Sequence, residues 1–92
     1  MDKPIVVERC IDEARKQALG TRAWPVWSKE ASRFAWYYDS SETCLLIAGE
    51  VTVTPREGEA VTLRAGDLAT FPAGMHCEWH ITRDLSKHYR VG

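Results

Sequence analysis

The chain has 92 residues, enough for one domain with a single core and too few for two. Its formal charge of −1 at pH 7 provides no broad basic surface for nucleic acid or anionic lipid. No apolar run approaches the ~20 residues that a membrane-spanning helix needs. No signal peptide precedes the first charged residues, so we expect a cytoplasmic protein whose three cysteines are thiols. The expectation is a single domain over residues 1–92 that binds neither nucleic acid nor membranes.

The N-terminal segment predicts one strand and one helix. Residues 5–7 are a β-branched run, which is typical of a short strand at a sheet edge. Residues 12–19 are mostly good helix formers. Asp12 can cap the start of this helix, and Gly20 stands where a left-handed C-terminal cap is usual. We therefore expect one short helix over residues 12–19.

Residues 21–32 contain two tryptophans, Trp24 and Trp27, on either side of a proline. Each tryptophan covers about 150–250 Å², which is costly to leave in water. We interpret this segment as an irregular strap that either closes one end of the body or forms a subunit contact, with plain core packing as the structural alternative. The second alternative, together with uncovered strand edges, predicts a homodimer.

The middle of the chain carries the strongest strand patterns. Residues 43–54 give the longest strand signal, with either a bulge or a tight hairpin at Gly49. In the preceding run, alternation places three aromatic side chains on one face of a strand: Phe34, Trp36 and Tyr38.

The last forty residues alternate short strand patterns with turns. Residues 55–59 predict an exposed hairpin loop, and residues 83–86 a polar connection. Turns are expected where glycine or proline favours them, at Gly66, Pro72 and Gly74. The expected strands are 60–63, 68–71, 77–82 and 87–91. Short strands at near-regular spacing predict an all-β fold, an antiparallel β-barrel with one short N-terminal helix.

Most of the chain resembles the small single-domain cupins of the RmlC-like superfamily, in the ureidoglycine-aminohydrolase-like subgroup. The resemblance implies a cupin antiparallel β-barrel, or jelly roll, with a pocket at one mouth that usually takes a small molecule. It also points to ureide or amide substrates. The matching motifs are Trp24-Pro-Val-Trp27, Phe34-x-Trp36-Tyr37-Tyr38-Asp39, Glu42-Thr-Cys44, Gly49-x-Val-x-Val-Thr54, Gly66-Asp-Leu, Phe71-Pro-x-Gly74, Cys77-x-Trp79 and Lys87-His-Tyr89.

Cupins commonly bind a metal through three histidines and one glutamate. The resemblance places Glu42 at the acidic position, but the histidine positions hold Trp36, Tyr38 and Cys77. Tryptophan is no metal ligand, and one carboxylate with one thiol falls short of the ligands that Zn²⁺ or Fe²⁺ requires. We therefore expect a degenerate metal site with no cofactor, a weakly bound divalent metal being the alternative.

Three further metal-binding side chains, His76, Glu78 and His80, are one residue out of phase with Cys77. A one-residue offset on a strand directs a side chain to the opposite face. We interpret these three as part of a solvated outer face, with a surface metal at His76 and Glu78 as the alternative. His88 is likewise expected at the surface.

The candidate site combines polar and aromatic side chains expected on the inner face of the barrel. Three carry chemistry, namely Glu42 as general acid or base, Cys77 as nucleophile or acid, and Lys87 beside them. Five would contact a ligand: Trp36, Tyr38, Cys44, Trp79 and Tyr89. The purely structural alternatives are a Glu42 that pairs with Lys87 or Tyr38, and cysteines that pack as small core residues.

Three functions remain open at this stage: a small-molecule enzyme, a ligand-binding module, and a barrel used for assembly. The reactivity of Cys77 bears on this choice. A nearby Lys87 would favour the thiolate, whereas a dominant aromatic lining would keep the thiol protonated and inert. We expect the first alternative, a moderately reactive Cys77, with Cys44 slower.

Overall fold

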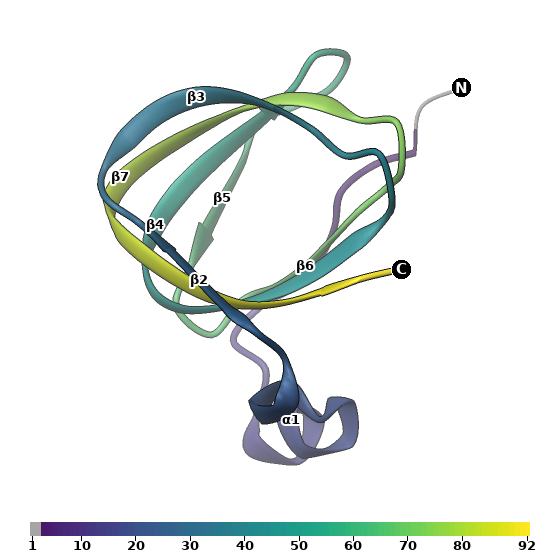
Figure 1. The fold of residues 1–92 in the computed structure, drawn as a ribbon, viewed down its shortest axis with the longest axis vertical. Coiled ribbons are helices and arrows are strands. Elements are labelled where there is room, and N and C mark those ends of the chain that lie inside the picture. The colour runs from purple at the N-terminus through teal and green to yellow at the C-terminus, as the bar shows by residue number, and fades with distance from the viewer. Residues whose placement is uncertain (1–2) are drawn as a thin grey trace.

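The computed structural model describes residues 3–92 and shows one bent antiparallel sheet whose strands form a ring (Figure 1). This confirms the all-β barrel with one short helix. No helix in residues 3–92 is long and apolar enough to cross a membrane. The elements in chain order are β1 (Val6–Glu8), α1 (Glu13–Leu19), a 3₁₀ turn (Thr21–Ala23), β2 (Val26–Lys29), β3 (Ser32–Tyr37), β4 (Glu42–Pro55), β5 (Val61–Arg64), β6 (Leu68–Phe71) and β7 (His76–Val91).

The two long strands, β4 and β7, form the frame of the barrel. They pair antiparallel from Glu42 opposite Val91 to Pro55 opposite Cys77. On its other edge β4 pairs first with β6 and then with β5. The other edge of β7 pairs with β3 and then with β2, and β1 extends the sheet beyond β6. The inward side chains of β4 and β7 therefore reach one shared interior.

A bulge at Gly49 bends β4 where it passes β7. The register shifts between Ala48 and Glu50, and Gly49 has φ +92°. A Cβ atom at this position would lie 2.8 Å from the Arg83 carbonyl oxygen, so a side chain has no room. The bulge alternative is confirmed, and the tight hairpin is wrong because β4 continues to Pro55.

Two sequence-based boundaries are wrong. Residues 83–86 are no connection, because β7 runs through them and is the longest described strand, at 16 residues. Their polarity reflects an exposed outer face, whereas Leu85 in the same stretch is 3% exposed and points into the core. The segment with the two tryptophans is not fully irregular either, since β2 pairs with β7 from Val26 opposite His88.

The helix has the predicted caps and lies outside the ring of strands (Figure 1). The Asp12 carboxylate accepts a hydrogen bond from the Arg15 amide at 2.8 Å, and Gly20 closes the helix at φ +71°. A small outer cluster joins this segment to the sheet through Trp24, Leu45 and Leu68, with Ile11 and Leu19 packed against it. The chain itself therefore buries Trp24, and this tryptophan no longer argues for a subunit contact.

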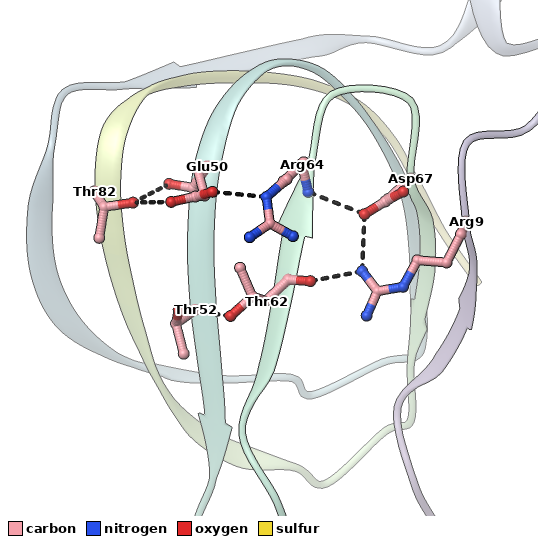
Figure 2. A network of polar contacts seen from close by, with 7 residues as sticks. All are labelled: Arg9, Glu50, Thr52, Thr62, Arg64, Asp67 and Thr82. Atoms are coloured by element: carbon pink, nitrogen blue, oxygen red, sulfur yellow. Dashed lines mark hydrogen bonds and ion pairs between the residues drawn. The ribbon is translucent and has the colours of Figure 1, made fainter.

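Asp67, in the turn before β6, anchors the N-terminal segment to the sheet (Figure 2). Its carboxylate accepts hydrogen bonds from the amides of Cys10 and Arg64, each at 3.0 Å, and from the Arg9 guanidinium at 2.9 Å. Arg9 also donates to the Thr62 carbonyl oxygen at 2.6 Å. This outer polar network holds the chain from β1 to α1 against the β5–β6 turn.

Candidate functional site

A cavity of about 200 Å³ lies inside the ring, near the end of β3 and the start of β4. Three larger hollows, of about 700, 660 and 470 Å³, lie beside the 55–57 loop, beside α1 and beside the end of β2, and none of their linings contains a Trp, Tyr or Phe. The inner cavity instead combines six aromatic side chains with two charged ones. Its lining is Trp27, Phe34, Trp36, Tyr38, Glu42, Trp79, Lys87 and Tyr89.

Strand alternation brings these side chains together. The predicted shared face of Phe34, Trp36 and Tyr38 is confirmed, because all three line the cavity. Tyr38 follows the end of β3 and is fixed by two backbone hydrogen bonds, one from its amide to the Met75 carbonyl oxygen at 3.0 Å and one from the Gly74 amide to its own carbonyl oxygen at 2.6 Å. The predicted turn at Gly74 therefore positions part of the cavity wall.

Glu42 and Lys87 form an ion pair in the cavity wall. Lys87 Nζ donates to Glu42 Oε2 at 2.8 Å, and their side chains are only 8% and 13% exposed, respectively. The ammonium also lies over three aromatic rings, 4.6 Å from Trp79, 5.1 Å from Trp27 and 5.9 Å from Tyr89. The expected inward orientation of Lys87 is confirmed, and of the two structural partners considered for Glu42, Lys87 and Tyr38, it is Lys87 that forms the pair.

The aromatic rings pack mainly edge to face around the cavity. Trp79 stacks with Phe34 at a centroid distance of 6.2 Å and meets the edge of Trp27 at the same distance. Trp36, 45% exposed, forms the rim. Sequence reasoning did not assign Trp27 and Phe34 to the site. Phe34 could have been assigned from its alternation with Trp36. Trp27 was missed because residues 21–32 were expected to be irregular, whereas Trp27 lies in β2 and points into the cavity.

Two buried polar atoms of the lining, Tyr38 Oη and Trp79 Nε1, make no hydrogen bond of good geometry among residues 3–92, although the Trp79 side chain lies close enough to Tyr38 and Cys77 to lower their pKa values in part. Such unpaired groups are rare in native interiors, so their presence distinguishes this region from an ordinary packed core. Burial, and then the Glu42 carboxylate, raise the pKa of Tyr38. Tyr38 therefore keeps its hydroxyl proton at neutral pH.

Cys44 and Cys77 lie behind the cavity wall and are absent from its lining. Both belong to the buried core, as their predicted inward direction requires, and Cys77 Sγ lies 3.7 Å from the Trp36 carbonyl oxygen. Burial raises the pKa of Cys44 to about 11. Burial also raises the pKa of Cys77 and outweighs the opposing effects of Trp79 and Lys87. This direction favours the second alternative for Cys77, a protonated and inert thiol.

The outer face carries the three side chains that are out of phase with Cys77. His76 and Glu78 are exposed and His80 is half-buried, which confirms their outward orientation. Arg33 pairs with Glu78 at 3.3 Å and contacts His80 at 3.2 Å, and the Tyr37 ring packs on His76. His88 is also outward but half-buried, because its ring contacts the Trp24 carbonyl oxygen.

The donor set of the cavity does not fit a transition metal. Its one carboxylate, Glu42, is already paired through one oxygen with the Lys87 ammonium, and the remaining lining is aromatic, which leaves too few ligands for such an ion. Residues 3–92 contain no group of three or more His, Cys, Asp or Glu side chains that could hold an ion. We therefore derive no chemistry through a metal for this site.

The sequence pattern of the EutQ-like cupin domain matches residues 16–89, which is most of the chain. The chain belongs to the EutQ-like cupin family. It is similar to the crystal structure of a DUF861 family protein from Thermotoga maritima, with 37% identity and a TM-score of 0.92 over 97% of this chain and 100% of that one. This cupin therefore shares its whole architecture with that protein.

Two other solved structures share the barrel. A DUF861 family protein of unknown function from Pseudomonas syringae is 26% identical, with a TM-score of 0.66 over 73% of this chain and 29% of that one. A putative ethanolamine utilization protein Q from Salmonella typhimurium is 24% identical, with a TM-score of 0.65 over 72% and 53% of the two chains. A comparison with curated protein sequences gives no match. These likenesses support the cupin fold and assign no specific activity.

Proposed function

We propose that this cupin binds a small organic molecule through a planar apolar group, in the aromatic cavity of the barrel and without a transition metal. The observation that carries the proposal is the cavity lining, which places six aromatic side chains around one buried ion pair. Ligand sites are typically mostly apolar with a few placed polar groups, and this lining has that composition.

The size of the cavity limits the ligand. Drug-sized molecules occupy pockets of roughly 300–1,000 Å³, whereas this cavity measures about 200 Å³. An apolar cavity of about 150 Å³ in another protein accepts benzene. A single six-membered ring with one or two substituents is therefore the size class that fits here.

An acid–base role for Glu42 and Lys87 is the second candidate. It is favoured by their position in the cavity wall, where a bound molecule would contact both groups. Cys77 is a weaker participant, because it lies behind the lining and burial raises the pKa of its thiol. The structural alternative for the pair is that it only links β4 to β7.

Three finer expectations are also proposals. Membership of the ureidoglycine-aminohydrolase-like subgroup would bring ureide or amide substrates. A cytoplasmic location follows from the sequence expectation above. A homodimer is supported by the outer edge of β1, where Val6 is 58% exposed, since an open strand edge invites pairing.

The test of the binding proposal is a screen of one-ring compounds by ligand-observed NMR and thermal shift. We expect saturable binding that Trp36→Ala weakens about fivefold or more, because one aromatic contact is worth about 1 kcal/mol. Tyr37→Ala is the matched control, since Tyr37 is the adjacent aromatic, is 50% exposed and lies on the outer face. Equal effects of the two variants, or no saturable binding, would contradict the proposal.

A further inference from the structure

The charges of the cavity wall cancel one another. Among residues 3–92, Glu42 and Lys87 are the only charged side chains of the lining, and they form one ion pair. A ligand that carries a net charge would therefore lie against a buried pair whose charges already neutralise each other, without a free counter-charge. Burying an unpaired charge is costly, so the lining selects against both anions and cations.

The same pair still has unused hydrogen-bonding capacity. Lys87 Nζ donates to Glu42 Oε2, and within residues 3–92 the second carboxylate oxygen, Oε1, accepts no hydrogen bond. An ammonium group has three N–H donors, so two remain beyond the one that binds Glu42, and Nζ lies 4.6 Å from the Trp79 ring centroid and 5.1 Å from that of Trp27. One acceptor and one donor therefore stand side by side in the cavity wall.

We propose that the ligand is an uncharged single-ring molecule whose polar edge carries a hydrogen-bond donor beside an acceptor, as in phenol or 2-pyridone. Its donor binds the free oxygen of Glu42, its acceptor binds Lys87, and its ring packs among the aromatic side chains. This inference rests on the proposed binding function and adds the chemical class of the ligand.

The test compares five one-ring probes by isothermal titration calorimetry at pH 7. Phenol and 2-pyridone carry a donor and an acceptor, toluene carries neither, benzoate is an anion and benzylammonium is a cation. Hydrogen bonds to charged groups are the stronger ones, so we expect the first two to bind at least about tenfold more tightly than toluene. Benzoate and benzylammonium should each bind more weakly than phenol and 2-pyridone.

Two single variants should change the preference in opposite directions. Glu42→Gln leaves Lys87 as the only charged residue of the lining, so benzoate should become the preferred probe. Lys87→Met leaves Glu42 alone, so benzylammonium should become preferred. The double variant Glu42→Gln/Lys87→Met is neutral and should bind toluene about as well as phenol. It also keeps the test decisive if a single variant unfolds, because it contains no unpaired charge.

Several results would overturn the inference. If wild-type protein binds toluene as tightly as 2-pyridone, with the Trp36 dependence intact, the ligand class is wrong and the binding function stands. If wild-type protein prefers benzoate or benzylammonium, the neutral class is also wrong. If the double variant still binds phenol more tightly than toluene, as the wild type does, the ion pair does not bind the donor and acceptor of the ligand. If no probe binds, the inference and the proposed function both fail.

Discussion

Glu42 and Asp67 are both acidic, both shielded from water, and both within hydrogen-bond distance of a basic side chain, at 2.8 and 2.9 Å. Asp67 uses both of its oxygens. One accepts from the Cys10 amide, and the other accepts from the Arg9 side chain and the Arg64 amide (Figure 2). Glu42 has one partner and one free oxygen, beside a cavity. A carboxylate whose two oxygens are both bonded serves the fold, whereas one with a free oxygen beside a cavity is available to a ligand.

The largest expected effect comes from breaking the inner pair. Removing one partner of a buried ion pair typically costs about 3–5 kcal/mol, because the other charge remains buried. Both side chains border a small cavity, so we expect a loss near the lower end, about 3 kcal/mol, for Glu42→Gln or Lys87→Met. Urea unfolding monitored by circular dichroism measures it.

The double variant Glu42→Gln/Lys87→Met is the control for this prediction. Without an unpaired charge, it should regain most of the stability that either single variant loses. If both single variants lose less than about 1 kcal/mol in the free energy of unfolding, the pair is solvated. The Glu42–Lys87 pair would then not contribute more to stability than the outer network around Asp67.

The next effect concerns Asp67. Burial alone would raise its pKa, but hydrogen bonds from the Cys10 and Arg64 amides and from Arg9 outweigh burial and hold the pKa of Asp67 below its usual value. Asp67→Ala leaves these donors without their acceptor, so we expect a loss of about 2 kcal/mol at pH 7. Arg64→Gln is the control, because the Arg64 side chain is 64% exposed and its ion pair with Glu50 lies at the surface. This control should leave the urea midpoint unchanged.

Asp67 also gives the outer network a pH dependence. Because its pKa is lowered by folding, its contribution to stability is complete above the unfolded value, near 3.8, and is lost as the pH falls through the folded value. Urea unfolding between pH 7 and pH 2.5 should therefore show a smaller decrease in stability for Asp67→Asn than for the wild type. An unchanged pH profile in this variant would show that Asp67 is not the group responsible.

The smallest effect requires no mutation and compares two thiols of the two regions. Cys10 is exposed beside the outer network, whereas Cys77 is buried behind the cavity wall. Burial raises the pKa of Cys77, and the thiolate is the reactive form. Timed alkylation with peptide mapping should label Cys10 first and Cys77 only slowly in folded protein. Labelling of Cys77 at a rate like that of Cys10 would instead show that Cys77 is the reactive thiol expected from the sequence.

The local sequence determined most of the elements and the direction of most side chains. Caps at Asp12 and Gly20 defined the helix, and the period-two alternation identified the inward face of the strands, including Lys87 and Trp79. These features depend on near neighbours in the chain, so they can be read without knowledge of the fold. The strand through residues 83–86 was missed because its polar residues lie on the exposed face, and a polar run resembles a connection.

Which inward side chains reach the cavity depends on how distant strands pack. Alternation cannot distinguish Cys77, which faces inward behind the wall, from Tyr38, which lines it, because both have the same orientation. Whether an inward side chain reaches the cavity depends on the bend at Gly49, the pairing of β2 with β7 and the sizes of neighbouring rings. The contact between Glu42 and Lys87, 45 residues apart, likewise exists only because β4 and β7 pair along the barrel. The sequence determined the direction of each side chain, because direction follows from alternation along one strand. The packing of distant strands determined its contacts, because these depend on the distance between residues far apart in the chain.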